Sequence, residues 1–497
     1  MAKKNELTYL QSPLPEGRKY YKSKKLSFSG LNKRYTIDTG VLSYEKNIST
    51  VEAPYLTPSP VPTFIYEPKV NGMTGFISGI FGFENYVVVI FTIENTSYID
   101  YVDDNGRFAT GTLSEDITSQ RSIVQFNVYE KNEEGRVDPL KGKYYKKLLI
   151  FPDKKSVDLN VEKDYTNITD LKPASLEIDG QHYLPNIKYA TVHLSRVFGV
   201  DDDRVYASGF NDYANWNLDT AEEYNESNAW CSPAQANVKA DSKFTGITTY
   251  QNHVVCFKRN FMHEIYNTKN PFRIQDIYAE GAIDNRTIQD VDGNLIFVSD
   301  DNVKIYTGSN PKIISYSLNI NKYDKAISGQ DGRNYYLYVE SGNDKYFFVY
   351  DTMVDEWSER EIDEEIVGFA NNSKGVYMAT KTKVYKLNTN DFSQEWAFET
   401  DLVTNNTVDI KHIKKLQMLG DFTNCDLDVY ILYDDEVFNA EKSHKVFSRT
   451  ELTGRKPIRI KPRKTAHYGF KLHFDGKGYA KLYELEIFTQ QGGVLYV

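Results

Sequence analysis

The sequence has little cysteine, no long apolar run and little helical periodicity, and each shortage excludes a class of protein. Its three cysteines, Cys231, Cys256 and Cys425, are far apart and odd in number. They exclude a disulfide framework and fit a reducing compartment. The longest apolar run, residues 86–93, is far shorter than the roughly 20 residues of a membrane-spanning helix. The first residues lack the apolar stretch of a signal peptide, so we predict neither export by that route nor a membrane anchor.

The motifs of common enzyme classes are also missing. The eight histidines show no HExxH or Cys/His ligand spacing, and no GxSxG, Walker or GxGxxG segment occurs. Residues 299–306 partly resemble the Asp-box turn of sialidases, but they lack its glycine, and such a turn is not catalytic. The acidic runs 103–106 and 201–203 lack the register of a calcium loop and fit solvated hairpin tips. We therefore predict no enzyme activity, no metal and no cofactor.

Charge is distributed unevenly along the chain, whose net charge is −10. Residues 1–36 hold nine Lys/Arg against two Glu, and residues 442–471 hold ten against one, whereas residues 37–441 carry a net −25. An acidic body is a poor surface for holding nucleic acid, because phosphate binding needs Lys and Arg to replace counterions. An acidic passage would instead let DNA slide through. The simpler alternative is a soluble acidic surface with two basic ends.

Residues 1–70 are predicted to form an extended arm. They are basic and rich in tyrosine, and they end in prolines at positions 54, 58, 60, 62 and 68. Proline favours extended backbone over helix. We assign Lys22, Lys24 and Lys25 of this arm to contacts with assembly partners.

Residues 71–390 repeat a rhythm of short strands and turns. Tyrosine and phenylalanine, 38 and 27 against 4 tryptophans, favour pleated, half-buried strands. Four clear copies are spaced by 41, 38 and 40 residues, and weaker copies start near residues 77, 122 and 190. The clear copies start at Ile247, Ile288, Ala326 and Ile366. This period is typical of β-propeller blades, which close into a ring. We predict about seven blades, with a range of six to eight; a β-sandwich or irregular β array is the alternative.

Residues 391–497 alternate as strands without this repeat and predict a C-terminal β-sandwich. Its basic cluster is expected on loops and solvent-facing positions. The cations assigned there to assembly contacts are Arg455, Lys456, Arg459, Arg463 and Lys464.

Three residues are predicted to have structural roles in the propeller. Trp216 ends a polar loop that follows the strand-like residues 204–208, and we expect its indole to be buried and to anchor that loop. Gly209 begins the same loop. Gly293 lies at the first turn of a repeat, where a tight hairpin needs positive φ.

The order of motifs between residues 190 and 320 is distinctive. RVYASG at 204–209 is followed by WN at 216–217, FK at 257–258, EIY at 264–266, GAI at 281–283, RTI at 286–288 and GNLIFVSDD at 293–301. This order resembles the tail nozzle, or DNA-stabilisation, proteins of short-tailed bacteriophages. The resemblance implies a propeller-bearing subunit, commonly six copies in a ring below the portal and adaptor, with no catalytic residues.

The function expected from these observations is that of a virion tail protein assembled in the host cytoplasm. It would form a homo-oligomeric ring, which the resemblance implies to be a hexamer. It would contact other tail proteins and pass double-stranded DNA without sequence specificity. One alternative is a propeller that binds or cleaves glycans, such as a receptor-binding protein of the same kind of particle. Another is a cytoplasmic protein-interaction propeller, although no regular WD or kelch signature occurs.

Overall fold

The computed structural model is almost entirely β-structure. Among the described residues there are two 3₁₀ helices of a single turn, η2 (Asn285–Thr287) and η3 (Tyr316–Leu318), and no segment forms an apolar helix of membrane-spanning length. The residues that the structure describes are 21–115, 120–129, 144–159, 168–171, 177–178, 181–182, 185–216, 218, 227–232, 243–387, 389–404, 410–434, 436–460, 462 and 467–491.

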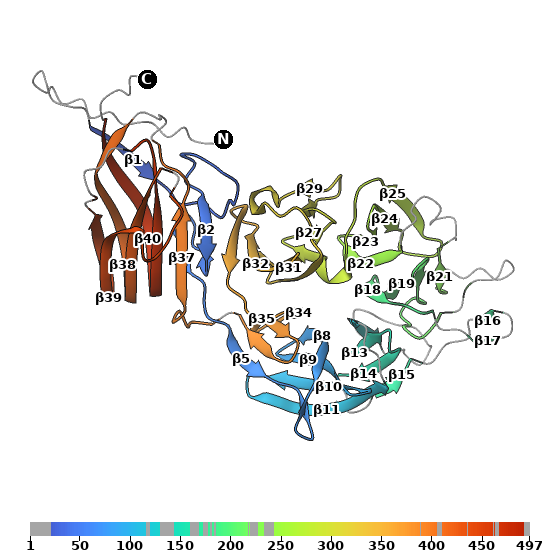
Figure 1. The fold of residues 1–497 in the computed structure, drawn as a ribbon. Helices are drawn as coiled ribbons and strands as arrows, with labels where there is room; N and C mark the ends of the chain where they lie inside the picture. Colours follow the sequence, from blue (N-terminus) through green and yellow to red (C-terminus); the bar gives the residue numbers. More distant parts are fainter. Residues whose placement is uncertain are drawn as a thin grey trace, which may run out of the picture.

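Seven four-stranded antiparallel sheets stand around a common centre as the blades of a propeller (Figure 1). Blade 1 contains β8 (Phe76–Phe83), β9 (Tyr86–Ile93), β10 (Thr96–Asp103) and β11 (Gly106–Glu115). Blade 2 contains β12 (Ser122–Tyr129), β13 (Tyr144–Phe151), β14 (Lys155–Asp158) and β15 (Ile168–Asp170). Blade 3 contains β18 (Tyr189–His193), β19 (Arg196–Val200), β20 (Val205–Ala207) and β21 (Trp230–Cys231). Blade 4 contains β22 (Phe244–Tyr250), β23 (His253–Lys258), β24 (Phe261–Tyr266) and β25 (Arg273–Ile277).

The remaining blades complete the ring. Blade 5 contains β26 (Gln289–Val291), β27 (Asn294–Val298), β28 (Val303–Tyr306) and β29 (Lys312–Ile313). Blade 6 contains β30 (Lys325–Gln330), β31 (Asn334–Ser341), β32 (Asp344–Asp351) and β33 (Glu356–Arg360). Blade 7 contains β34 (Ile366–Asn372), β35 (Gly375–Thr380), β36 (Val384–Lys386) and β5 (Thr63–Tyr66). The predicted propeller is confirmed, and each blade starts within three residues of a predicted repeat start.

The apolar residues explain why the blades form a ring. Seven separate hydrophobic cores lie between the blades, and each contains side chains from two neighbours. Between blades 1 and 2, for example, Val88 and Ile90 pack with Leu148 and Ile150, all fully buried. Each sheet therefore leaves an apolar face that only the next blade covers, and closing the ring covers the last one.

Blade 7 is closed by a strand from the N-terminal region. Tyr66 of β5 lies opposite Val384 of β36, so the outer strand comes from more than 300 residues earlier in the chain. The Tyr66 hydroxyl also donates a short hydrogen bond to the buried carboxylate of Asp100 in blade 1. Residues 63–66, which lie within the predicted arm, are therefore part of the propeller.

The C-terminal region forms one six-stranded sheet with an N-terminal contribution. Its order is β2 (Leu42–Lys46), β37 (Glu395–Thr400), β40 (Phe470–Gln491), β38 (Lys411–Tyr433), β39 (His444–Ile460), with β1 (Tyr21–Leu26) also pairing with β40. Residues of positive φ and register shifts interrupt the long strands near Asn424 and Gly478. Such irregularities bend strands, and both halves of the sheet contribute side chains to one core, which gives the sandwich.

Three further pairs of short strands occur among the described residues, before β5, between β5 and blade 1, and between blades 2 and 3. They are the paired strands β3 (Ile48–Ser49) and β4 (Thr57–Pro58), β6 (Lys69–Val70) and β7 (Met73–Thr74), and β16 (Glu177–Ile178) and β17 (Gln181–His182).

Hydrogen bonds at the end of β2 join the sandwich to blade 6. The backbone N–H of Asn47 donates to the carbonyl of Glu359 at 2.9 Å, and Asn47 Oδ1 accepts from the N–H of Glu361 at 2.9 Å. Asn47 Nδ2 donates to the carbonyl of Glu395 at 2.8 Å, in the sandwich strand β37. One side chain therefore bonds to strands of both domains.

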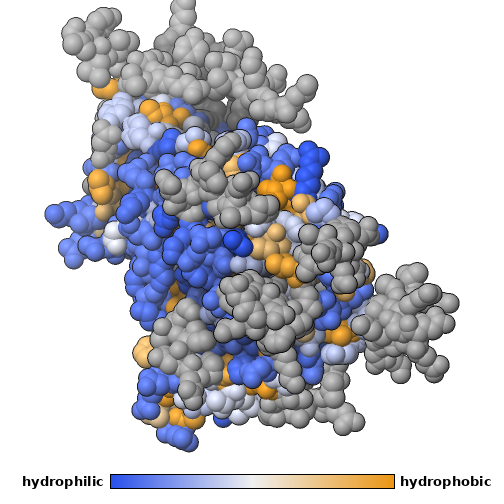
Figure 2. Space-filling view, turned by 90° about the vertical axis from the view of Figure 1, so that its right-hand side faces the viewer, coloured by the Kyte–Doolittle hydropathy of each residue, from blue (hydrophilic) through white to orange (hydrophobic). Residues whose placement is uncertain are grey.

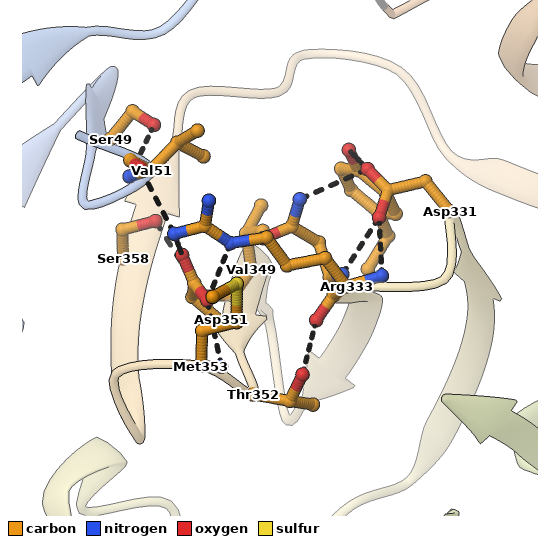
Figure 3. Close-up of polar contacts among 11 residues, drawn as sticks. Ser49, Val51, Asp331, Arg333, Val349, Asp351, Thr352, Met353 and Ser358 are labelled. Carbon is orange, nitrogen blue, oxygen red and sulfur yellow. Dashed lines mark hydrogen bonds and ion pairs between the residues drawn. The ribbon is translucent and has the colours of Figure 1, made fainter. Parts of the chain in front are cut away.

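A charged pair ties blade 6 to the segment after β3 (Figure 3). Arg333 donates to Asp351 from Nε at 2.9 Å and from Nη2 at 2.5 Å, and Nη2 also donates to the carbonyl of Val51 at 2.9 Å. The hydrogen bonds that Arg333 donates to Asp351 raise the pKa of Arg333 despite partial burial. Because the Asp351 side chain is only 1% exposed, this bidentate pair holds the Val51 backbone at a fixed position.

The predicted structural residues occupy defined positions. Trp216 is 1% exposed and packs in the core between blades 2 and 3. Gly209 lies against Asn215, where a Cβ atom would come within 2.8 Å of that side chain. Asp292 and Gly293 form the two-residue turn between β26 and β27 with φ of 51° and 73°, the positive values that this hairpin needs.

Candidate assembly surface

The acidic and histidine positions form no metal-binding cluster in the described part of the chain. No group of three or more His, Cys, Asp or Glu side chains there is arranged to hold a metal ion. Asp201 instead accepts hydrogen bonds from the N–H groups of Asp203 and Arg204, as a hairpin tip does. In the segment that resembles an Asp box, the Ser299 hydroxyl donates to the Asn302 carbonyl at 3.1 Å, which closes a turn.

Side chains from opposite blades meet near the centre of the propeller. Arg286, in η2 before blade 5, donates from Nη1 to Gln120 Oε1 before blade 2 at 3.2 Å. Gln120 Nε2 donates to the carbonyl of Val367 in blade 7 at 3.4 Å. Three blades are thus bridged by hydrogen bonds across the ring.

The strand β39 is the outer edge of the sandwich. Among the described strands it pairs with β38 alone, and in Figure 1 it lies on the side away from the propeller. It carries five cations and one acid, and we call it the basic edge. Its cations are Lys445, Arg449, Arg455, Lys456 and Arg459.

The five cations of the basic edge differ in their partners. Lys445 pairs with Asp428 at 2.7 Å, and Arg455 donates to the Tyr483 hydroxyl at 2.7 Å while lying over its ring. Arg449, Lys456 and Arg459 are exposed, and their side chains form no hydrogen bond or ion pair with any other described residue. These three positive charges are therefore available to another molecule.

The sandwich brings the two basic ends of the chain onto one sheet. In register across four strands lie Lys25 of β1, Glu486 of β40, Gln417 of β38 and Arg459 of β39. Residues in register share a face of a sheet, so Lys25 and Arg459 lie on the same face with two strands between them.

Not all of the predicted N-terminal cations are free. Lys25 forms a 2.6 Å ion pair with Glu484, whose hydrogen bond and charge raise the pKa of Lys25. Lys22 and Lys24 lie in β1 opposite Thr489 and Ile487. Arg463 and Lys464 lie outside the described residues. Of the predicted contact residues, Lys456 and Arg459 have free charges, and Arg449 joins them as a third that the sequence-based selection missed.

A shallow aromatic groove adjoins the basic edge on this face. Tyr55 and Tyr483 pack edge to face with ring centroids 4.7 Å apart, beside Leu419 and Glu484. The groove continues past Gln417 and Pro457 to Arg459. Strand alternation marks Arg459 as exposed, but the sequence gives no signal for the approach of Tyr55 to Tyr483.

The described surface of the blades farthest from the sandwich lacks a large apolar patch (Figure 2). In Figure 2 this face is mainly hydrophilic, with small separate apolar spots among the described residues. A large apolar patch would mark a permanent protein interface, so polar and charged contacts are the ones that the described part of this face offers.

The propeller topology defines the class of protein, and comparison with known proteins adds similarity in fold alone. No known family and no curated protein matches the sequence. The chain is similar to the β-propeller domain of Cps50 (Swd1) from Myceliophteria thermophila, with a TM-score of 0.40 at 8% identity over 66% of this chain and 100% of that one. It is also similar to the WD40 domain of Toxoplasma gondii coronin, with a TM-score of 0.37 at 8% identity over 73% and 90%.

Proposed function

We propose that this protein is a structural subunit of a phage tail, a ring-forming nozzle protein that retains the genome and forms part of the DNA-ejection channel. The observation that carries the proposal is the open basic edge of the sandwich, on a chain whose residues 37–441 carry a net −25. Opposite charges on two surfaces of one chain favour head-to-tail contacts between copies. The motifs that resemble tail nozzle proteins fall in blades 3 to 5 and support the same class.

In this proposal the DNA channel lies between copies rather than through a propeller. The hydrogen bonds of Arg286 and Gln120 bridge the propeller centre, so a ring of several copies, six by the family resemblance, would enclose the duplex. Acidic surfaces facing that space would repel phosphates and let DNA slide. Contacts between copies and with the adaptor would use the cations of the sandwich.

The test is charge reversal on the basic edge in an infecting particle. Reversing Arg455, Lys456 and Arg459 to Glu should lower incorporation of the chain into particles about tenfold, because contacts between charged surfaces become repulsive. Circular dichroism should show an unchanged fold, since all three side chains are exposed. The matched control reverses three exposed cations of the propeller rim, Arg273, Lys312 and Lys345, with the same change in net charge. Normal incorporation of the first variant would refute the proposal.

The aromatic groove favours a second candidate function, glycan binding by a receptor-binding tail protein. Paired tyrosines beside amide and charged side chains are a common surface for sugars, and here these are Tyr55, Tyr483, Gln417 and Arg459. Binding of surface polysaccharide from a host bacterium, lost in the Tyr55→Ala/Tyr483→Ala variant, would support this function. A co-sedimentation assay in which the protein does not bind the polysaccharide would exclude this function.

A further inference from the structure

The basic edge has the geometry of a strand that can accept another strand. β39 is 17 residues long, and no described strand pairs with its outer side. An edge strand presents unpaired N–H and C=O groups, and an extended peptide can add to it by backbone hydrogen bonds.

The chain protects only part of this edge. Pro457 lacks an N–H and is tolerated because β39 is an edge strand, and it would interrupt pairing near the C-terminal end. Glu451 and Gly454 have φ of 54° and 77° and bend the strand, whereas the stretch from Lys445 to Thr450 contains neither proline nor a residue of positive φ. This stretch includes Ser448, Arg449 and Thr450, all exposed, so both backbone and side chains are accessible.

The charges of the edge determine which strand it can accept. Five cations and one acid give β39 a net charge of +4, so pairing of two β39 strands from two copies would bring like charges together. The same row attracts a strand that carries carboxylates. The net positive charge thus disfavours self-pairing and selects an acidic partner.

Duplex DNA fits this surface less well than an acidic strand. The free cations lie along one line, at the edge, whereas Glu484 and Glu486 lie on the adjoining face two strands from Arg459. A phosphate backbone crossing that face would meet these carboxylates. A strand placed beside β39 would meet the five cations of the edge and one acid, Glu451.

We infer that β39 accepts an acidic extended segment of a neighbouring tail protein as an added strand. This inference rests on the proposed function for the source of the partner, and it deepens that function by naming the kind of contact. The added segment would extend the sandwich sheet beyond β39 and place its carboxylates near Arg449, Lys456 and Arg459.

The test uses the full-length protein and a labelled ten-residue peptide that alternates Glu and Val. Fluorescence anisotropy should show binding that weakens at least tenfold in the Arg449→Glu/Arg459→Glu variant and stays unchanged in the Arg273→Glu/Lys312→Glu control. Hydrogen exchange should show new protection of amides between residues 445 and 455. A peptide that alternates Lys and Val should not bind.

Each other outcome contradicts the inference. These outcomes are no binding of the Glu-Val peptide, binding without amide protection in β39, and tighter binding of a short DNA duplex that the peptide cannot displace. The incorporation test is independent, because it uses particles rather than a peptide. Failure of strand addition with loss of incorporation in the Arg455/Lys456/Arg459 variant would leave the nozzle function standing.

Discussion

The hydrogen bond between Tyr66 and Asp100 should stabilise closure of the propeller ring. Asp100 is fully buried; its Oδ2 accepts from Tyr66 and, at 3.5 Å, from Arg107, while its Oδ1 is unpaired among the described residues. The Tyr66→Phe substitution keeps the aromatic side chain in place and removes its hydroxyl. A buried carboxylate that loses a partner costs about 1–3 kcal/mol. We expect the free energy of local opening of β5 and β36 to fall by this amount.

Hydrogen exchange followed by mass spectrometry measures this opening segment by segment. Exchange in β5 and β36 should accelerate, since these strands lose the anchor to blade 1, while β38 in the sandwich should keep its rate. The control is Tyr385→Phe on β36, because its hydroxyl makes only a long 3.4 Å bond to Glu364, which also pairs with Lys383. Equal exchange in the two variants, or faster exchange everywhere, would refute the assignment of Tyr66 as the closing contact.

Two further predictions concern buried ionisable groups in the sandwich. Burial raises the pKa of Glu45 well above its usual value, so Glu45→Gln should stabilise the chain at neutral pH. This gain in stability should disappear below about pH 4.5. A lower melting temperature of the variant at pH 7 would contradict the prediction. Burial opposes protonation of His473, but its hydrogen bonds and ion pairs with Asp475 and Glu399 outweigh burial and raise the pKa of His473. The positive charge of His473 therefore stabilises the fold at low pH, and this contribution is lost as pH rises through the raised pKa. His473→Gln should flatten stability against pH above about 6.5, which melting curves across pH 5.5–8.5 would check.

The blades could be predicted because each repeat has its own local signal. Runs such as residues 334–341 and 344–351 combine β-favouring aromatic residues with turns that contain glycine. Partners distant in sequence gave no such signal. β5 is a strand of four residues between prolines, and nothing local shows that it pairs with β36.

The long sandwich strands show a second limit. The alternation of buried and exposed residues in β38 breaks near Asn424, where φ is 44° and the register shifts. A bulge reverses which side chains face the core, and a period-two pattern then reads as two strands.

The candidate surface was partly predictable for the same reason. Exposure of Arg455 and Arg459 follows from their alternation with the buried Ile458 and Ile460. The 2.6 Å contact of Lys25 with Glu484 joins residues 459 positions apart, and no local pattern predicts it. The sequence therefore identifies the cations but not which of them keep a free charge.

The strand order also sets a sequence of events during synthesis. β5 is made before all seven blades, so the propeller ring can close as soon as β36 leaves the ribosome. The sandwich must wait for β40, which lies between β37 and β38 and also pairs with β1. Until then β39, already synthesised, has an incomplete sheet behind it. A newly made chain would thus carry a finished propeller before its edge strand is fixed in a complete sheet.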